Sequence, residues 1–333
     1  MTSRTFTRLL SIVTLVAPSL LATAAPARAY SNLVFFGDSV SDSGNVAQAI
    51  GATSGVMQTI TGNSYIPDYP YAPSGRFSNG SVWAEDFAQM LGLAAAPSLT
   101  GGSNFAWAGA RTGGSGQQVP TLTEQSQQFL ASVGQVAPAG ALYVIAEIGN
   151  DARDALGALA TSQNAPLTIQ QFAMDYADHL GNIVDNLRSH GARNFLVFDN
   201  VDLGVVPAIT FAGGGVPGTA TYLASVMNSA LATRLQGQRG VTLFDTFSFL
   251  DGVVQQPAAY GFTNATDACG AIAGADCSRY VFWDGLHPTA AMHQVIANAA
   301  FAAAVPEPST LVLMAAGVAG MLFKTRRRKG THP

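Results

Sequence analysis

The sequence predicts an α/β protein in which a mostly parallel sheet is covered by helices on both faces. Two observations support this fold class. Short, continuously apolar runs alternate along the chain with longer segments that have the periodicity of amphipathic helices. The apolar runs lack alternating polar residues, which is typical of strands buried on both faces. With 333 residues, 48% of them hydrophobic, the chain is long enough for one large domain with additional targeting segments.

Four apolar runs are clear strand predictions, and a fifth segment has a weaker pattern. The first run, NLVFFG, ends in glycine, and the other three have the same apolar character. The sheet is therefore expected to be mostly five-stranded. The predicted strands are 32–37, 142–149, 194–201 and 241–246, with 103–109 as the weaker fifth.

Five segments have helical periodicity. The pattern is clearest where Phe172, Tyr176 and Leu180 fall on one face of the predicted helix. Residues 45–80, rich in glycine, serine, tyrosine and proline, have no convincing period, and we predict a long loop positioned to overhang a site. The predicted helices are 81–91, 121–133, 168–190, 219–236 and 288–303.

Residues 1–29 have the organisation of a secretory signal peptide. Arg4 and Arg8 precede an apolar run over 9–25, and the run is followed by the small-x-small cleavage pattern ARA at 27–29. The alternative is a buried N-terminal helix, but such a helix has no need of these three parts in this order. We therefore predict export.

The two cysteines of the chain are expected to form a disulfide. Export places the protein in an oxidising compartment, where disulfides persist. Cys269 and Cys277 have no neighbouring His or Cys that would complete a zinc site. A bridge between them is the favoured prediction.

The C-terminal segment, 305–333, resembles the PEP-CTERM sorting signal of Gram-negative bacteria. Its three parts occur in order: the triplet PEP at 306–308, an apolar run over 310–323, and the basic end KTRRRK. The resemblance implies processing by an exosortase, delivery to the cell envelope or exterior, and a transient membrane anchor over 309–323. The alternative is a last core helix with a solvated basic tail. The folded domain is predicted to span 30–304.

Between its two ends the chain is acidic. Residues 30–305 contain eight arginines, no lysine and nineteen acidic residues, which gives a net charge of −11. Phosphate backbones are bound by clustered cations, so this composition argues against a nucleic-acid partner.

Chemically useful residues follow the predicted strands. In an open parallel sheet, sites form at the edge where the carboxyl ends of the strands meet. Ser39 follows the first strand, Gly109 the weak strand and Asn150 the next one. Asp284 and His287 lie in a Gly- and Pro-bounded turn before the last helix. We therefore expect all five residues at one edge.

These residue types suit acyl transfer through a serine. A serine becomes a nucleophile when a base removes its proton, and histidine suits that role because its pKa lies near neutrality. Asp284, three residues before His287, is placed to accept the ring N–H. Backbone N–H groups at Ser39 and Gly109 and the Asn150 amide are candidate donors to an oxyanion. Taken singly, each of these residues could instead form a turn or a helix cap.

The other histidines and one glycine cluster are not assigned to chemistry. His179, His190 and His293 fall inside or at the ends of predicted helices and are expected to be structural. No His, Asp and Glu cluster has metal-ligand spacing, so no metal site is expected. The glycines over 213–218 lack the Lys-Ser/Thr that follows in a phosphate-binding loop.

Four sequence blocks in order resemble the GDSL, or SGNH, hydrolase family of esterases and lipases. The resemblance extends over residues 31–304 and also includes GRFSNG followed by Trp83, which is typical of the bacterial and plant lipase branch. Val40 stands where the family name has leucine, and Ala108 where a glycine is common. The four blocks are FGDSVSDSGN at 36–45, NFAWAGA at 104–110, GND at 149–151 and FWDGLHPT at 282–289.

The resemblance implies a flavodoxin-like α/β/α sandwich that hydrolyses carboxylic esters without a cofactor. It assigns Ser39 as the nucleophile, with Asp284 and His287 completing the triad. It places the backbone N–H groups of Ser39 and Gly109 and the side chain of Asn150 in the oxyanion hole. The alanine at position 108, where the family commonly has glycine, affects only the detailed backbone geometry expected beside Gly109.

Two other functions remain open at this stage. An acyltransferase of the same fold would pass the acyl group to an alcohol or a sugar instead of water. A catalytically silent envelope protein would use the fold to bind glycan or matrix. The substrate is also open among short acyl esters, lipids, phospholipids and acetylated exopolysaccharide. The expected partners are such an ester substrate and the exosortase machinery.

Overall fold

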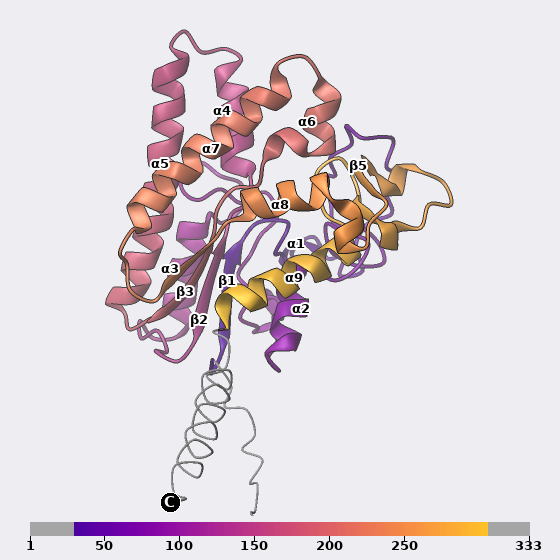
Figure 1. The fold of residues 1–333 in the computed structure, drawn as a ribbon. Coiled ribbons are helices and arrows are strands. Elements are labelled where there is room, and N and C mark those ends of the chain that lie inside the picture. Colours follow the sequence, from indigo (N-terminus) through magenta and orange to yellow (C-terminus); the bar gives the residue numbers. More distant parts are fainter. Residues whose placement is uncertain (1–29, 306–333) are drawn as a thin grey trace, which may run out of the picture.

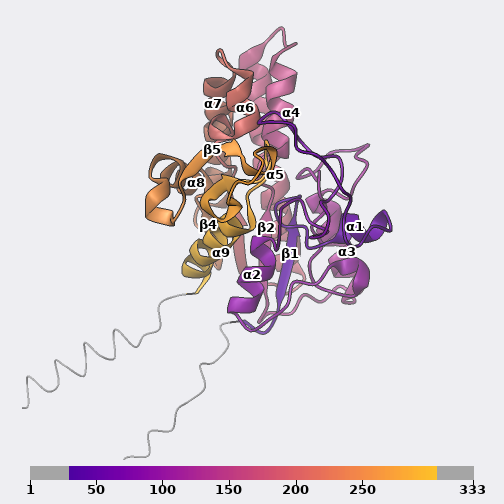
Figure 2. The same cartoon turned by 90° about the vertical axis from the view of Figure 1, so that its right-hand side faces the viewer.

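The computed structural model describes residues 30–305, and Figures 1 and 2 show them from two directions. The predicted signal peptide, 1–29, and the predicted tail anchor, 309–323, lie outside the described residues. Among the helices of residues 30–305, none is long and apolar enough to cross a membrane.

A parallel four-stranded sheet lies at the centre of the fold, which confirms the predicted fold class. Its strands follow in the order β1–β2–β3–β4, and every residue of β1 and β2 is buried. Burial of both faces accounts for their continuously apolar sequences. The four clear strand predictions are confirmed, with bounds β1 Leu33–Gly37, β2 Leu142–Ala146, β3 Asn194–Phe198 and β4 Val241–Phe244.

The predicted fifth strand, 103–109, is an irregular edge segment instead of a regular strand. Three backbone hydrogen bonds of 2.8 to 3.0 Å join it to β1. Between this segment and β1, only Phe35 and Asn104 form a regular parallel bridge. The Asn104 side chain donates to the Ser41 carbonyl at 2.7 Å, which fastens this segment to the loop after β1.

Helices cover both faces of the sheet, giving three layers (Figures 1 and 2). On one face α3 packs against α5 and α5 against α7, and on the other α2 packs against α9. Successive β1 side chains point to opposite layers, since Phe36 contacts Phe129 of α3 and Phe35 contacts Trp83 of α2. These helices confirm the five predictions, with bounds α2 Trp83–Met90, α3 Leu122–Ser132, α5 Ala165–Ser189, α7 Val216–Leu235 and α9 Ala290–Ala304.

Several shorter elements were not predicted from the sequence. The long loop prediction over 45–80 is wrong for its first five residues, which form α1. A second, two-stranded parallel sheet precedes α9. The segment of chain that connects its two strands contains the Cys269–Cys277 disulfide. The additional elements are α1 Asn45–Ala49, α4 Asn150–Leu159, α6 Pro207–Ala212, α8 Thr246–Gln255, β5 Asn264–Ala268 and β6 Tyr280–Phe282.

Candidate active site

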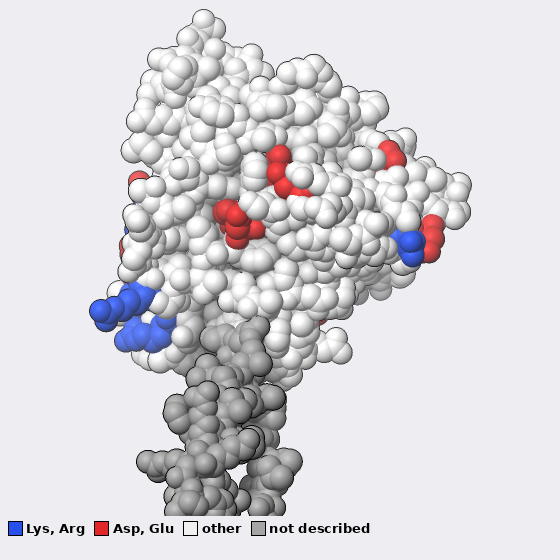
Figure 3. Space-filling view, in the orientation of Figure 1, with Lys and Arg blue, Asp and Glu red and all other residues white. Residues whose placement is uncertain are grey.

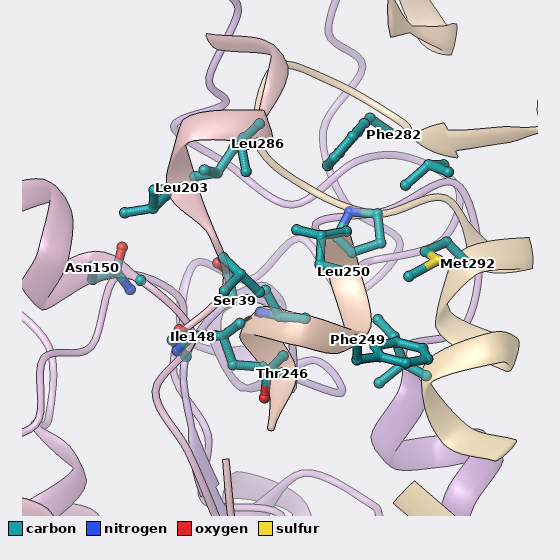
Figure 4. A pocket seen from close by; sticks show the side chains of 18 of the residues that line it. Ser39, Ile148, Asn150, Leu203, Thr246, Phe249, Leu250, Phe282, Leu286 and Met292 are labelled. Carbon is teal, nitrogen blue, oxygen red and sulfur yellow. Dashed lines mark hydrogen bonds between the residues drawn. The ribbon is translucent and has the colours of Figure 1, made fainter. Parts of the chain in front are cut away.

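The loop after β1 presents Ser39 at the carboxyl edge of the sheet (Figure 4). The neighbouring Asp38 holds this loop in place, because its carboxylate accepts the Val40 N–H at 2.9 Å and the Ile148 N–H at 2.8 Å. The second contact ties the loop to the end of β2. Burial raises the pKa of Asp38 to about 6. Ser39 itself is 7% exposed.

His287 and Asp284 meet Ser39 from a distant part of the chain. The His287 Nε2 atom lies 2.9 Å from the Ser39 hydroxyl oxygen, and its Nδ1 atom lies 2.8 Å from the Asp284 carboxylate. Asp284 also accepts the backbone N–H groups of Leu286 and His287, both at 2.7 Å, so it fixes the turn that carries the imidazole. Thr289 caps α9 directly after this turn. The geometry lets a proton pass from the serine to a histidine that a carboxylate orients.

Tyr71 is a member of this cluster that sequence reasoning missed. Its hydroxyl donates to the same Asp284 oxygen that His287 contacts, at 2.8 Å, and its ring packs edge-on against Trp283. Phe77 lies against the His287 ring, with ring centroids 5.5 Å apart. Both aromatic residues come from the long loop predicted over 45–80; Phe77 lies in the GRFSNG motif, which carried no role at the site in the sequence analysis, and no sequence pattern marked Tyr71.

Gly109 and Asn150 lie together near Ser39. Gly109 has a φ of +81°, a conformation that side chains rarely adopt, and this turn directs the chain toward the site. The Asn150 side chain donates to the Ala110 carbonyl at 3.0 Å, which links α4 to that turn. Among residues 30–305, no other group accepts a hydrogen bond from the backbone N–H of Ser39 or Gly109. These N–H groups are therefore available to an anionic oxygen.

Two buried carboxylates position the loops that carry these donors. Asp42 accepts the Ala108 N–H at 3.2 Å, which connects the loop after β1 with the Gly109 turn. Glu147 accepts the first N–H groups of α4, from Gly149 at 3.2 Å, from Asp151 at 3.0 Å and from Asn150. Burial raises the pKa of Glu147 well above its ordinary value.

An apolar cavity opens beside Ser39 and Asn150 (Figure 4). It has an empty volume of about 690 Å³, including its open mouth. Phe249 and Leu250 of α8 and Met292 of α9 lie on the side opposite Asn150. The remaining apolar wall includes Ile148, Leu203, Val281, Phe282, Leu286 and Ile296.

The other histidines have structural contacts. His293 is fully buried, its Nδ1 atom accepts the Trp83 N–H at 3.1 Å, and burial lowers its pKa to about 3. His179 lies 3.1 Å from the Thr112 hydroxyl, and His190 donates to the Asn186 carbonyl at 2.8 Å. Within residues 30–305, no three His, Cys, Asp or Glu side chains are grouped so as to hold a metal ion.

Comparison with known proteins gives two family matches and several relatives. Residues 33–300 match the model of GDSL-like lipases/acylhydrolases, and residues 304–328 match the PEP-CTERM protein-sorting motif. An Arabidopsis thaliana GDSL esterase/lipase is 26% identical over 84% of this chain and 88% of its own length. The thermolabile hemolysin of Vibrio parahaemolyticus is 26% identical over 80% of this chain and 62% of its own. A solved phospholipase A1 from Streptomyces albidoflavus aligns over 80% of this chain and 95% of its own, with 14% identity and a TM-score of 0.37.

Proposed function

Because the chain belongs to the GDSL-like lipase/acylhydrolase family and is therefore an ester-hydrolysing serine hydrolase, we propose that it works through an acyl-serine intermediate formed on Ser39. The observation that carries this proposal is the 2.9 Å contact between the Ser39 hydroxyl and His287, with Asp284 behind the imidazole. A serine and an Asp–His turn from two distant parts of the chain converge there in the order that nucleophile activation requires.

The first half of the reaction forms the acyl-enzyme. Ser39 attacks the ester carbonyl while His287 takes the serine proton, and Asp284 stabilises the imidazolium that results. His287 then protonates the departing alcohol oxygen as the carbon–oxygen bond of the ester breaks. In the second half, water attacks the acyl carbon while His287 takes its proton. His287 then returns that proton to the Ser39 oxygen as the bond between this oxygen and the acyl carbon breaks, which releases the acid.

The oxyanion formed in each half needs preorganised donors. The proposed donors are the backbone N–H groups of Ser39 and Gly109 and the side-chain amide of Asn150. Their support comes from the two N–H groups available at the site and from the Asn150 contact to the Ala110 carbonyl, which holds the amide beside the Gly109 turn. Donors of this kind typically contribute about 10²–10³ each in rate.

The chain carries a PEP-CTERM protein-sorting motif, which indicates export and an envelope destination. Beyond this, we propose that residues 1–29 are removed as a signal peptide. An exosortase then processes the chain near 306–308, and 309–323 serves as a transient membrane anchor. Detection of the mature protein in envelope or medium fractions, with its C-terminus determined by mass spectrometry, tests this route.

Replacement of the nucleophile tests the mechanism. Ser39→Ala should lower kcat for a p-nitrophenyl ester by about 10⁴ or more and abolish labelling by a fluorophosphonate probe. Ser43→Ala is the matched control, because its buried hydroxyl lies on the same loop and has no hydrogen-bond partner among residues 30–305. A Ser39→Ala protein with unchanged thermal melting and full activity would refute the assignment.

A further inference from the structure

Arg153 is a cation beside the active site that the mechanism does not use. It lies on α4, one helical turn after Asn150, and it lines the apolar cavity that contains Ser39. It also lines a second, more open groove formed with residues of α4, α6 and the start of α7. The side chain therefore lies where the two hollows adjoin, on the α4 side of Ser39.

The Arg153 guanidinium has no partner among the described residues. Two other arginines, Arg76 and Arg111, form bidentate ion pairs with Glu85 and Asp154 respectively, at 2.6 to 3.1 Å. Arg153 is half-buried, yet it forms neither a salt bridge nor a hydrogen bond within residues 30–305. A half-buried guanidinium without a protein partner keeps its donors free for a ligand, and its partial loss of hydration favours such pairing.

The carboxylates near Arg153 do not pair with it. Asp154 is paired with Arg111. Asp38 binds backbone N–H groups through both oxygens. Glu147 binds three N–H groups through Oε1, its buried Oε2 has no partner among residues 30–305, and burial raises its pKa, which disfavours the charge that would pair with an arginine. An external anion is therefore the natural partner for the Arg153 guanidinium, whose planar donors match phosphate or carboxylate oxygens.

The two hollows differ in the part of an ester that each suits. The cavity between Ser39 and α8 and α9 is lined by aliphatic and aromatic side chains, which suits an acyl chain (Figure 4). The groove beyond Arg153 includes Ile66, Leu156, Ile209 and Val216 together with polar groups. A substrate whose acyl chain enters the first cavity would place its alcohol part toward α4 and Arg153.

We propose that Arg153 is a specificity residue that binds an anionic group, phosphate or carboxylate, on the alcohol part of the ester. The inference rests on the ester-hydrolase function proposed above and names its substrate class: amphiphilic esters with an apolar acyl chain and an anionic alcohol. Residues 30–305 have a net charge of −11, which repels anionic substrates in general, so binding of such an ester depends on a local cation such as Arg153.

A matched pair of substrates tests this proposal on the full-length protein. 1-Hexanoylglycerol and 1-hexanoylglycerol 3-phosphate contain the same scissile ester and differ by one phosphate, and the hexanoyl ester of glycerate supplies the carboxylate version. Arg153→Gln should lower kcat/KM for one or both anionic esters by about 10- to 100-fold, mainly through KM, and change the neutral ester less than threefold. Loss for the phosphate ester alone, or for the carboxylate ester alone, identifies the anion.

The control variant is Arg239→Gln, which removes the same charge from an exposed loop before β4, at the opposite edge of the sheet. An equal loss of kcat/KM for the anionic esters in both variants would show that only the overall charge of the protein matters, and would overturn the proposal. An equal loss for neutral and anionic esters in Arg153→Gln would overturn it as well. If Arg153→Gln does not fold, inhibition of the unmodified protein tests the proposal instead. Glycerol 3-phosphate or glycerate should competitively inhibit hydrolysis of the neutral ester, while glycerol should not. Inhibition by neither anion would overturn the proposal. Failure of the proposed Ser39 mechanism would give a different result: the Ser39→Ala protein would still hydrolyse the neutral ester.

Discussion

Asp284 is held by more donors than orientation of one imidazole requires. Its buried carboxylate accepts two backbone N–H groups, the His287 ring and the Tyr71 hydroxyl. Each donor removes some freedom of rotation from the carboxylate and stabilises its charge. Because Tyr71 and His287 contact the same oxygen, the tyrosine fixes the position from which Asp284 supports the histidine.

Tyr71→Phe should lower kcat by about 5- to 30-fold and leave KM within twofold, because it removes one hydrogen bond to a charged group and retains the ring. Steady-state kinetics with a p-nitrophenyl ester measure both constants. Tyr222→Phe serves as the control, since that tyrosine is 56% exposed on α7. A rise in KM with unchanged kcat would instead place Tyr71 in substrate binding.

Only some of the residues of the candidate site could be predicted from the sequence. Ser39, Asp284 and His287 lie in short local motifs, so their residue types could be recognised before any fold was known. Tyr71 could not be recognised, because its only link to the site is a contact across 213 positions of sequence, from a loop without periodicity. Local pattern identifies groups that react, whereas the groups that hold them depend on tertiary packing.

Asn150 lies in the first turn of α4, and the buried carboxyl group of Glu147 holds this turn in place. Glu147 caps three successive N–H groups at the start of this helix. Burial raises the pKa of Glu147, so the neutral acid is favoured and a glutamine can imitate it.

Glu147→Gln should therefore keep kcat within about threefold, while Glu147→Ala should lower kcat by about 10-fold or more because α4 loses its buried acceptor and Asn150 its fixed position. Ester hydrolysis and thermal melting of both variants provide the measurement. Equal kinetic losses in the two variants would show that the carboxylate charge, and not an acceptor for the helix, is what the site requires.

Helix length accounts for only part of what the sequence could predict. The 25 residues of α5 repeat their apolar pattern often enough to define a face. The ten residues each of α4 and α8 were not predicted, although the eight residues of α2 were. Both missed helices begin where carboxylates bind their first N–H groups: Glu147 for α4, and Asp199 and Asp245 for α8. The irregular edge segment 103–109 was similarly ambiguous, because its form follows from its contacts with β1 and the loop after it.

Across the whole domain, acidic side chains occur both on the surface and in the interior. The face in Figure 3 shows scattered charged groups, and the described residues contain no lysine. Inside the domain, burial raises the pKa of several carboxyls, among them Asp38, Asp42, Glu147 and Asp199. Both effects make the folded state bind protons more readily than the unfolded chain.

Stability should consequently fall as the pH rises from about 4 to about 7. Burial raises the pKa of Asp199 to about 7 from an ordinary value of 3.8, so within this window the unfolded chain loses a proton that the folded state retains. The free energy of unfolding then declines by up to about 1.4 kcal/mol per pH unit for this group. Asp199→Asn keeps an oxygen for the Thr246 N–H, 2.7 Å away, and should flatten the decline of Tm between about pH 4 and about pH 7. Exposed Asp68→Asn should leave the slope unchanged; an unaltered slope in Asp199→Asn would contradict the argument.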